Sequence, residues 1–101
     1  MMGFMSNGDV FLERDFAISY QEVNYKVKAK AVYSLQGRMA RAGCIIDFYS
    51  KDNHLAAFRL DTNSDSREEV RKAAEAAFDS GQVEACAKSA VQNWLNHGFS
   101  L

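Results

Sequence analysis

The 101-residue chain contains no proline and only six glycines, which are scattered along it. The absence of proline favours long, regular elements with few rigid loops. None of the glycines stands in the GxGxxG or Walker spacing that cradles phosphates, so no nucleotide-binding loop is indicated. No apolar run approaches the roughly 20 residues that span a bilayer. Residues 1–8 lack the basic and apolar regions of a signal peptide. We therefore expect no cofactor loop and no membrane partner.

Cysteine and histidine are equally scarce, with two of each. Cys44 and Cys86 stand 42 positions apart and form no CxxC motif. Two buried, reduced thiols in the cytoplasm fit this usage better than a disulfide does. His54 and His97 have no Cys or acidic neighbours at the spacing of a zinc site, which needs three or four ligands. The sequence thus predicts a cytoplasmic chain with no metal, no cofactor and no catalytic residues.

The composition is that of an ordinary folded domain, with 48% hydrophobic and 25% charged residues. The formal net charge is −1, but it is unevenly distributed. Residues 1–60 carry eight Lys and Arg against six Asp and Glu, whereas residues 61–101 carry four against seven. A weakly basic part is therefore followed by an acidic one, and the bulk charge does not mark the chain as a polyanion binder.

A strand over residues 25–33 organises the first part of the chain. Its odd positions carry Tyr, Val, Ala, Ala and Tyr, and its even positions carry three lysines followed by Val32. Side chains in a strand point alternately to two faces. One face should therefore be buried, and the other should expose a row of lysine ammonium groups. Ala29 and Ala31 make the buried face narrow, which predicts that a helix approaches closely.

The same alternation predicts the neighbouring strands. They cover residues 9–13, 15–21, 39–49 and 54–61. Turns are expected near residues 22–24, where Asn24 tolerates a left-handed backbone, and at the polar stretch 50–53. Gly43 indicates either a bulge or a close approach of another segment to the backbone.

The hydrophobic period then changes from two to 3.6. Apolar residues recur at helical spacing within residues 66–80 and again within residues 82–96. Ser66 and Glu69 form a capping box at the start of the first stretch. Gly81 separates the two, because glycine adopts the left-handed conformation that ends a helix. A single helix would instead bury charged residues beyond Gly81, so two helices are predicted.

Together these patterns predict an α+β fold. An antiparallel β-meander of about four strands, residues 9–61, is followed by two α-helices packed on one face of the sheet. Residues 1–8 are expected to form a flexible N-terminal arm and residues 9–101 a single domain.

The outer sheet face is the first candidate binding surface. The residues expected to point away from the helices are Lys26, Lys28, Lys30, Val32, Arg41, Ile45, Asp47, Tyr49, Leu55 and Arg59. The candidate interaction surface consists of Lys26, Lys28, Lys30, Arg41, Tyr49 and Arg59. Cations beside an aromatic ring suit the phosphates and bases of single-stranded nucleic acid. Strand lysines also serve simply to prevent edge-to-edge aggregation, and apolar residues among charges suit a protein partner.

The acidic helical part offers a second candidate surface. Its residues are Glu68, Glu75, Asp79 and Glu84. A solvated helix face is the simplest interpretation, and an acidic patch also suits a basic groove in a partner.

We expect a small non-enzymatic binding protein that acts through protein–protein interaction, of the inhibitor, immunity or phage and mobile-element accessory type. The alternative is a single-stranded nucleic-acid-binding protein that uses the lysine-rich sheet face, and an enzyme ranks third. The expected partner is another protein. A homodimer through a sheet edge is a further arrangement that the sequence leaves open.

Overall fold

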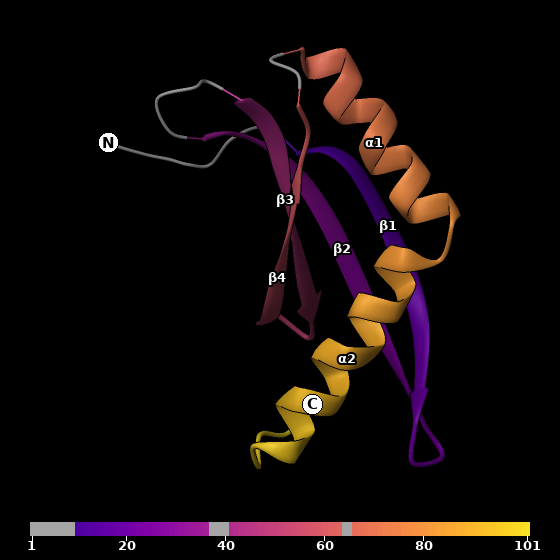
Figure 1. The fold of residues 1–101 in the computed structure, drawn as a ribbon. Coiled ribbons are helices and arrows are strands. Elements are labelled where there is room, and N and C mark those ends of the chain that lie inside the picture. Colours follow the sequence, from indigo (N-terminus) through magenta and orange to yellow (C-terminus); the bar gives the residue numbers. More distant parts are fainter. Residues whose placement is uncertain (1–9, 37–40, 64–65) are drawn as a thin grey trace.

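The computed structural model of the chain describes residues 10–36, 41–63 and 66–101. The predicted arm, residues 1–8, lies outside the described residues. In the described part, four strands form one antiparallel sheet in the order β1-β2-β3-β4, and two helices follow them (Figure 1). The elements are β1 (Val10–Tyr20), β2 (Val23–Gln36), β3 (Arg41–Ser50), β4 (Asn53–Asp61), α1 (Arg67–Asp79) and α2 (Gln82–Asn96). The predicted meander with two helices on one face of the sheet is confirmed.

β1 is one strand of 11 residues, where the sequence predicted two shorter strands. Arg14 stands at the expected interruption, but it pairs with Ala29 and stays in the ladder. Its guanidinium donates to Asp79 Oδ1 at 3.3 Å and lies 5.1 Å from the centre of the Phe78 ring. Asp79 and Phe78, at the end of α1, thus provide partners for the Arg14 guanidinium on the helix-facing side of the sheet. β1 therefore continues through Arg14.

The β1–β2 and β3–β4 hairpins each turn through two residues with positive φ. Gln21 and Glu22 have φ angles of 52° and 65°, and Lys51 and Asp52 have φ angles of 50° and 69°. Two successive left-handed residues are typical of the type I′ turn, whose twist matches that of the flanking strands. The turn predicted near residues 22–24 is present but lies at residues 21–22, so Asn24 already belongs to β2. The polar turn predicted between β3 and β4 is confirmed.

A register shift occurs in both the first and the last hairpin. In the first, Phe11 has no cross-strand partner, and its ring stacks on Tyr33 with the ring centres 4.0 Å apart. In the last, the register shifts between Phe48 and Tyr49, and Leu55 is the residue left over. Leu55 is half-buried and packs against the core. The expectation that Leu55 points away from the helices is therefore wrong.

The core lies between the sheet and the two helices. Ala29 and Ala31 are fully buried, as their narrow strand face predicts. The largest fully buried side chains are Phe48, Ile46, Val27, Val70, Val83, Val91 and Cys44. Burying one such side chain contributes roughly 1.5–3 kcal/mol. The small alanine side chains allow both helices to approach the sheet. Because both helices pack on this face, neither described helix covers the opposite face, which is called the open face below.

The helix boundaries follow the predicted signals. Ser66 Oγ accepts a hydrogen bond from the backbone N–H of Glu69 at 3.4 Å and caps α1. Gly81 has φ of 91° and lies between α1 and α2, which confirms the predicted break. Figure 1 shows both helices on the same side of the sheet.

Candidate functional site

The open face of the sheet carries charged side chains in cross-strand rows. In one row, Lys30 of β2 pairs with Glu13 of β1 and with Asp47 of β3. In the next row, Lys28 pairs with Asp15 and with Tyr49. Side chains of directly opposed residues share a face, so each of these two lysines has an acidic residue beside it.

Two of the three lysines of β2 form ion pairs with β1. Lys28 Nζ lies 3.4 Å from Glu13 Oε1 and 4.0 Å from Asp15 Oδ1, and Lys26 Nζ lies 3.9 Å from Asp15 Oδ2. All four side chains are substantially exposed, so each pair contributes only about 0–1 kcal/mol to stability. Their consequence is electrostatic, because the carboxylates offset the positive field of the lysines.

Lys30 and Tyr49 belong to a small cluster that joins β2, β3 and β4. Lys30 Nζ lies 5.3 Å from the centre of the Tyr49 ring, which is a cation–π distance. The Tyr49 and His54 rings are 5.1 Å apart, and His54 Nε2 lies 2.8 Å from Asp47 Oδ1. Burial and the Asp47 carboxylate raise the pKa of the Tyr49 hydroxyl, so Tyr49 presents a neutral phenol. We call Lys30, Asp47, Tyr49 and His54 the Tyr49 cluster.

The remaining cations predicted for this surface are not part of the cluster. Arg59 donates from Nε to Asp61 Oδ1 at 3.1 Å and pairs in the sheet with Ile45. Arg41 is the first residue of β3, and its side chain lies outside the described part of the structure. The structure therefore brings together Lys26, Lys28, Lys30 and Tyr49, with Arg59 nearer the other end of the same face.

Opposite charges balance on the open-face strand positions whose side chains the structure describes, a set that leaves out Arg41. The cations are Lys26, Lys28, Lys30 and Arg59, and the acids are Glu13, Asp15, Asp47 and Asp61. Four positive and four negative groups leave this part of the face with no formal net charge.

An apolar row lies beside the charged rows. Val10, Val32 and Ile45 are partners in the register of β1, β2 and β3, and Arg59 continues the row on β4. Val10 is 43% exposed, while Val32 and Ile45 are half-buried. The open face thus presents a short apolar strip bordered by paired charges, which is the composition of a typical protein interface.

Each acidic residue predicted for the second surface either has an ion-pair partner nearby or lies in the first turn of a helix. Asp79 binds Arg14 of β1, and Glu75 Oε2 lies 3.6 Å from Arg71 Nε one turn earlier in α1. Glu68 and Glu84 lie in the first turns of α1 and α2, where the helix dipole favours a negative charge. Cations are interspersed with these acids, so the helix layer presents mixed charge.

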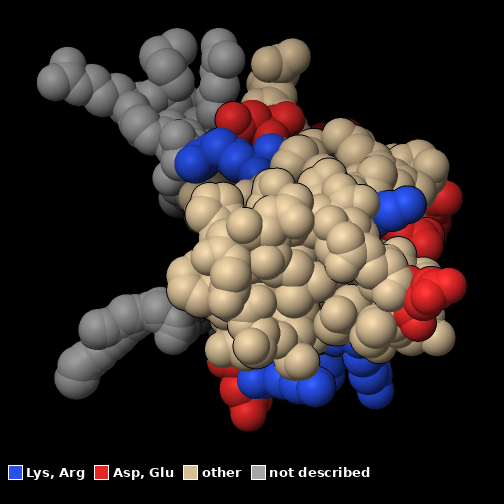
Figure 2. Space-filling model, turned by 90° about the horizontal axis from the view of Figure 1, so that it is seen from below, with Lys and Arg blue, Asp and Glu red and all other residues tan. Residues whose placement is uncertain are grey.

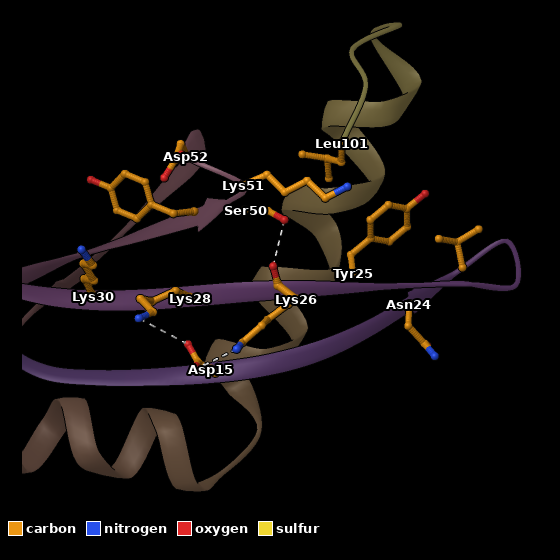
Figure 3. A pocket seen from close by; sticks show the side chains of 12 residues that line it. Asp15, Asn24, Tyr25, Lys26, Lys28, Lys30, Ser50, Lys51, Asp52 and Leu101 are labelled. Atoms are coloured by element: carbon orange, nitrogen blue, oxygen red, sulfur yellow. Dashed lines mark hydrogen bonds and ion pairs between the residues drawn. The ribbon is translucent and has the colours of Figure 1, made fainter.

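A hollow lies at the end of the open face beside the turn between β3 and β4. It has a volume of about 820 Å3. It is lined by Asp15, Val23, Asn24, Tyr25, Lys26, Lys28, Lys30, Tyr49, Ser50, Lys51, Asp52 and Leu101 (Figure 3). The buried Ser50 Oγ donates to the carbonyl oxygen of Lys26 at 2.8 Å. We call this hollow the β2 groove.

Sequence reasoning singled out four of the groove residues, Lys26, Lys28, Lys30 and Tyr49, and missed the others. Tyr25 was expected on the buried face, and Lys51 only in a turn. No local sequence pattern marks them, because they depend on β2, with 14 residues, extending past β3, with 10.

The end of the molecule next to this groove is largely uncharged. Figure 2 views the molecule from the side where the two hairpin turns and the end of α2 lie, and shows Lys, Arg, Asp and Glu around the rim of an uncharged centre. Two of the exposed large hydrophobic side chains, Val23 at 48% and Phe99 at 55%, follow the first turn and α2 respectively. The Phe99 ring packs on Trp94 with the ring centres 4.7 Å apart.

The cysteines and His97 are explained by local structure. Both thiols are free. Burial, with a smaller contribution from the Asp61 carboxylate, raises the pKa of Cys44 to about 11. Cys86 is half-buried, which corrects the expectation that it is buried, and burial raises its pKa. His97 Nδ1 lies 2.7 Å from the carbonyl oxygen of Asn93 at the end of α2.

Within the described ranges, no group of three or more His, Cys, Asp and Glu side chains is placed to hold a metal ion. Neither of the two described helices is long and apolar enough to cross a membrane. No family model, no curated protein and no solved structure matches the chain. The interpretation of function therefore rests on the open face and the β2 groove.

Proposed function

We propose that this chain is a small non-enzymatic protein that acts by binding another protein through the open face of its sheet. The observation that carries the proposal is the apolar row of Val10, Val32 and Ile45 beside rows of paired charges. Apolar side chains in the middle of a contact supply binding energy, and charges around them set orientation and exclude wrong partners.

Within this class we favour a protein that occupies and blocks its partner, as inhibitors, immunity proteins and accessory proteins of phages and mobile elements do. The binding side chains stand on strands rather than on loops, so little ordering entropy would be lost on association. The two free thiols support a reducing compartment such as the cytoplasm.

Binding of single-stranded nucleic acid remains the second candidate. The alternate lysines of β2 lie roughly 6–7 Å apart along the strand, close to the phosphate spacing of an extended strand, and Tyr49 could stack a base. The strands of the open face carry five cations, Arg41 included, against four acids, and this near balance argues against it. A nucleic-acid surface gains affinity by releasing counterions from phosphates, which requires an excess of cations.

A pair of variants with the same added charge tests the first proposal. Ile45→Glu places a carboxylate in the apolar row, and Ala76→Glu places one on the exposed side of α1 as the control. Partners are captured with the wild-type chain from lysate with and without nuclease treatment, and the affinity of the purified partner is then measured against both variants. We expect Ile45→Glu to weaken binding at least tenfold and Ala76→Glu to leave it unchanged.

Circular dichroism and thermal melting of both variants establish that they are folded. Equal affinity of Ile45→Glu and the wild-type chain would contradict the proposal. Capture that disappears with nuclease treatment, together with tight and salt-sensitive oligonucleotide binding, would favour the second candidate.

A further inference from the structure

β2 extends beyond β3 at the end of the sheet where the β2 groove lies. β2 pairs with β1 from Val23 onward, but its pairing with β3 begins only at Lys28. Residues 23–27 therefore have β1 on one side and, among the described residues, no strand on the other. At about 3.3 Å per residue this free edge is about 16 Å long.

The direction of the free backbone groups follows from one hydrogen bond. The carbonyl of Lys26 faces β3, because Ser50 Oγ of that strand donates to it at 2.8 Å. The N–H and C=O of one strand residue point to the same side, and successive residues alternate. Asn24 and Lys26 therefore face the open side, whereas Val23, Tyr25 and Val27 face β1. The N–H of Lys26 and both backbone groups of Asn24 are available to an added strand.

The side chains around this edge divide into a basic side and an apolar side. Lys26, Lys28 and Lys30 line the groove from the open face of the sheet. Tyr25 and Leu101 line it from the helix side, where both pack against the core. Figure 3 shows Lys51 extending from the turn between β3 and β4 toward Tyr25 and Leu101.

Charge selects the occupant of the groove. Four lysines line it against two acids, Asp15 and Asp52. Among the described side chains, Lys30 and Lys51 form no ion pair, while Lys26 and Lys28 do. A second copy of the chain added along the same edge would gather the lysines of both copies on one face of the joined sheet. An acidic segment would instead meet a lining that carries more ammonium groups than carboxylates.

We propose that the β2 groove binds an extended segment of a partner protein as an added strand, in which acidic and apolar side chains alternate. The acidic side chains lie beside Lys26 and Lys28, and the apolar ones lie beside Tyr25 and Leu101. This alternation follows from the period of two in any strand. The inference rests on the proposed function only in taking a protein as the partner.

Short capped peptides test the inference on the unchanged protein. The probe is acetyl-Glu-Val-Asp-Val-Glu-Val-amide, and the control replaces each acidic residue by Lys. Binding is followed by amide chemical shifts of the 15N-labelled chain. We expect the acidic peptide to bind at least tenfold more tightly than the basic one. We also expect amide hydrogen exchange at Asn24 and Lys26 to slow at least tenfold in the complex.

N-methylation distinguishes strand addition from simple charge attraction. In an added strand only every second peptide N–H faces β2. Methylating the amides that face β2 should abolish binding, and methylating the amides that face away from β2 should not. In an antiparallel arrangement the sensitive amides are those of the acidic residues, because these residues lie opposite Asn24 and Lys26 and the carbonyl of Asn24 is free to accept. Equal loss with both sets, or with neither, would overturn the proposal.

A matched pair of neutral variants tests the same edge from the protein side. Asn24→Pro removes an N–H that faces the open side and leaves the pairing of Tyr25 with β1 intact, and Asn24→Thr keeps that N–H. We expect Asn24→Pro, folded by circular dichroism, to bind the acidic peptide at least tenfold more weakly than Asn24→Thr does. If Asn24→Pro fails to fold, the N-methylated peptides decide.

Failure of this inference can be told apart from failure of the proposed function. If no peptide binds at millimolar concentration, strand addition in the β2 groove is refuted. Sensitivity of the captured partner to Ile45→Glu would in that case leave the binding function of the open face standing.

Discussion

Gly43 is the position at which a single added methyl group should reveal how closely β3 and β4 are paired. A Cβ atom at Gly43 would lie 2.7 Å from the carbonyl oxygen of Leu60 and 2.9 Å from Asp61 Oδ1. The first of these atoms belongs to the backbone of β4 and has no rotamer by which to move away. Gly43→Ala must therefore shift the end of β4 away from β3.

Two opposing effects set the expected loss of stability in Gly43→Ala. Overpacking costs about 1–3 kcal/mol, because backbone and side chains must leave their positions. Alanine in a strand loses less entropy on folding than glycine, which returns roughly 0.5–1 kcal/mol. We expect Gly43→Ala to reduce the free energy of unfolding by roughly 0.5–2 kcal/mol.

Guanidinium unfolding of wild type and variants measures this difference, and Gly81 provides the matched control. A Cβ at Gly81 meets nothing within 4 Å, but the φ angle there is +91°. Gly81→Ala should cost about 1–2 kcal/mol through backbone strain alone. Asn tolerates that conformation, so Gly81→Asn should recover stability relative to Gly81→Ala, whereas Gly43→Asn should be worse than Gly43→Ala. An unchanged midpoint for Gly43→Ala would refute the steric reasoning.

Three further predictions follow from the two faces of the sheet. Ala31→Leu should lower the free energy of unfolding by about 1–3 kcal/mol and Lys28→Leu by no more than about 1 kcal/mol, and the reverse order of denaturant midpoints would contradict the face assignment. The fully buried Cys44 should react with alkylating agents far more slowly than the half-buried Cys86. Because the pKa of Cys44 rises from 9.0 to about 11 on folding, stability should fall as the pH rises through this range, and less so in Cys44→Ala. A labelled oligonucleotide should bind the chain with micromolar or weaker affinity even at low salt, and replacing the three lysines of β2 by Ala should change neither this result nor folding.

Period and polarity were enough to predict most of the fold. The alternation over residues 25–33 assigned Ala29 and Ala31 to the buried face, and both are fully buried. The change of period and the left-handed Gly81 placed the two helices correctly. These features are local, because each depends on which face of an element is buried or on which backbone conformation a single residue can adopt.

The features that the sequence did not predict depend on partners distant in the chain. Arg14 stays in β1 because Asp79, at the end of α1, accepts its guanidinium. Leu55 turns toward the core because the register of β3 and β4 shifts beside Tyr49. The acids beside the lysines became visible only when the register placed Asp15 and its neighbours on the same face.

The β2 groove shows why the candidate site was harder to predict than the fold. Its length is the difference between two turn positions, one at residues 21–22 and the other at residues 51–52. Neither turn contains the glycine or asparagine that usually marks a type I′ turn, so strand pattern alone places such turns only to within a few residues. Placing the first turn at Asn24 would remove most of the free edge of β2. A shift of two or three residues leaves the fold class unchanged, yet it decides whether two backbone positions of β2 face a strand or an open groove.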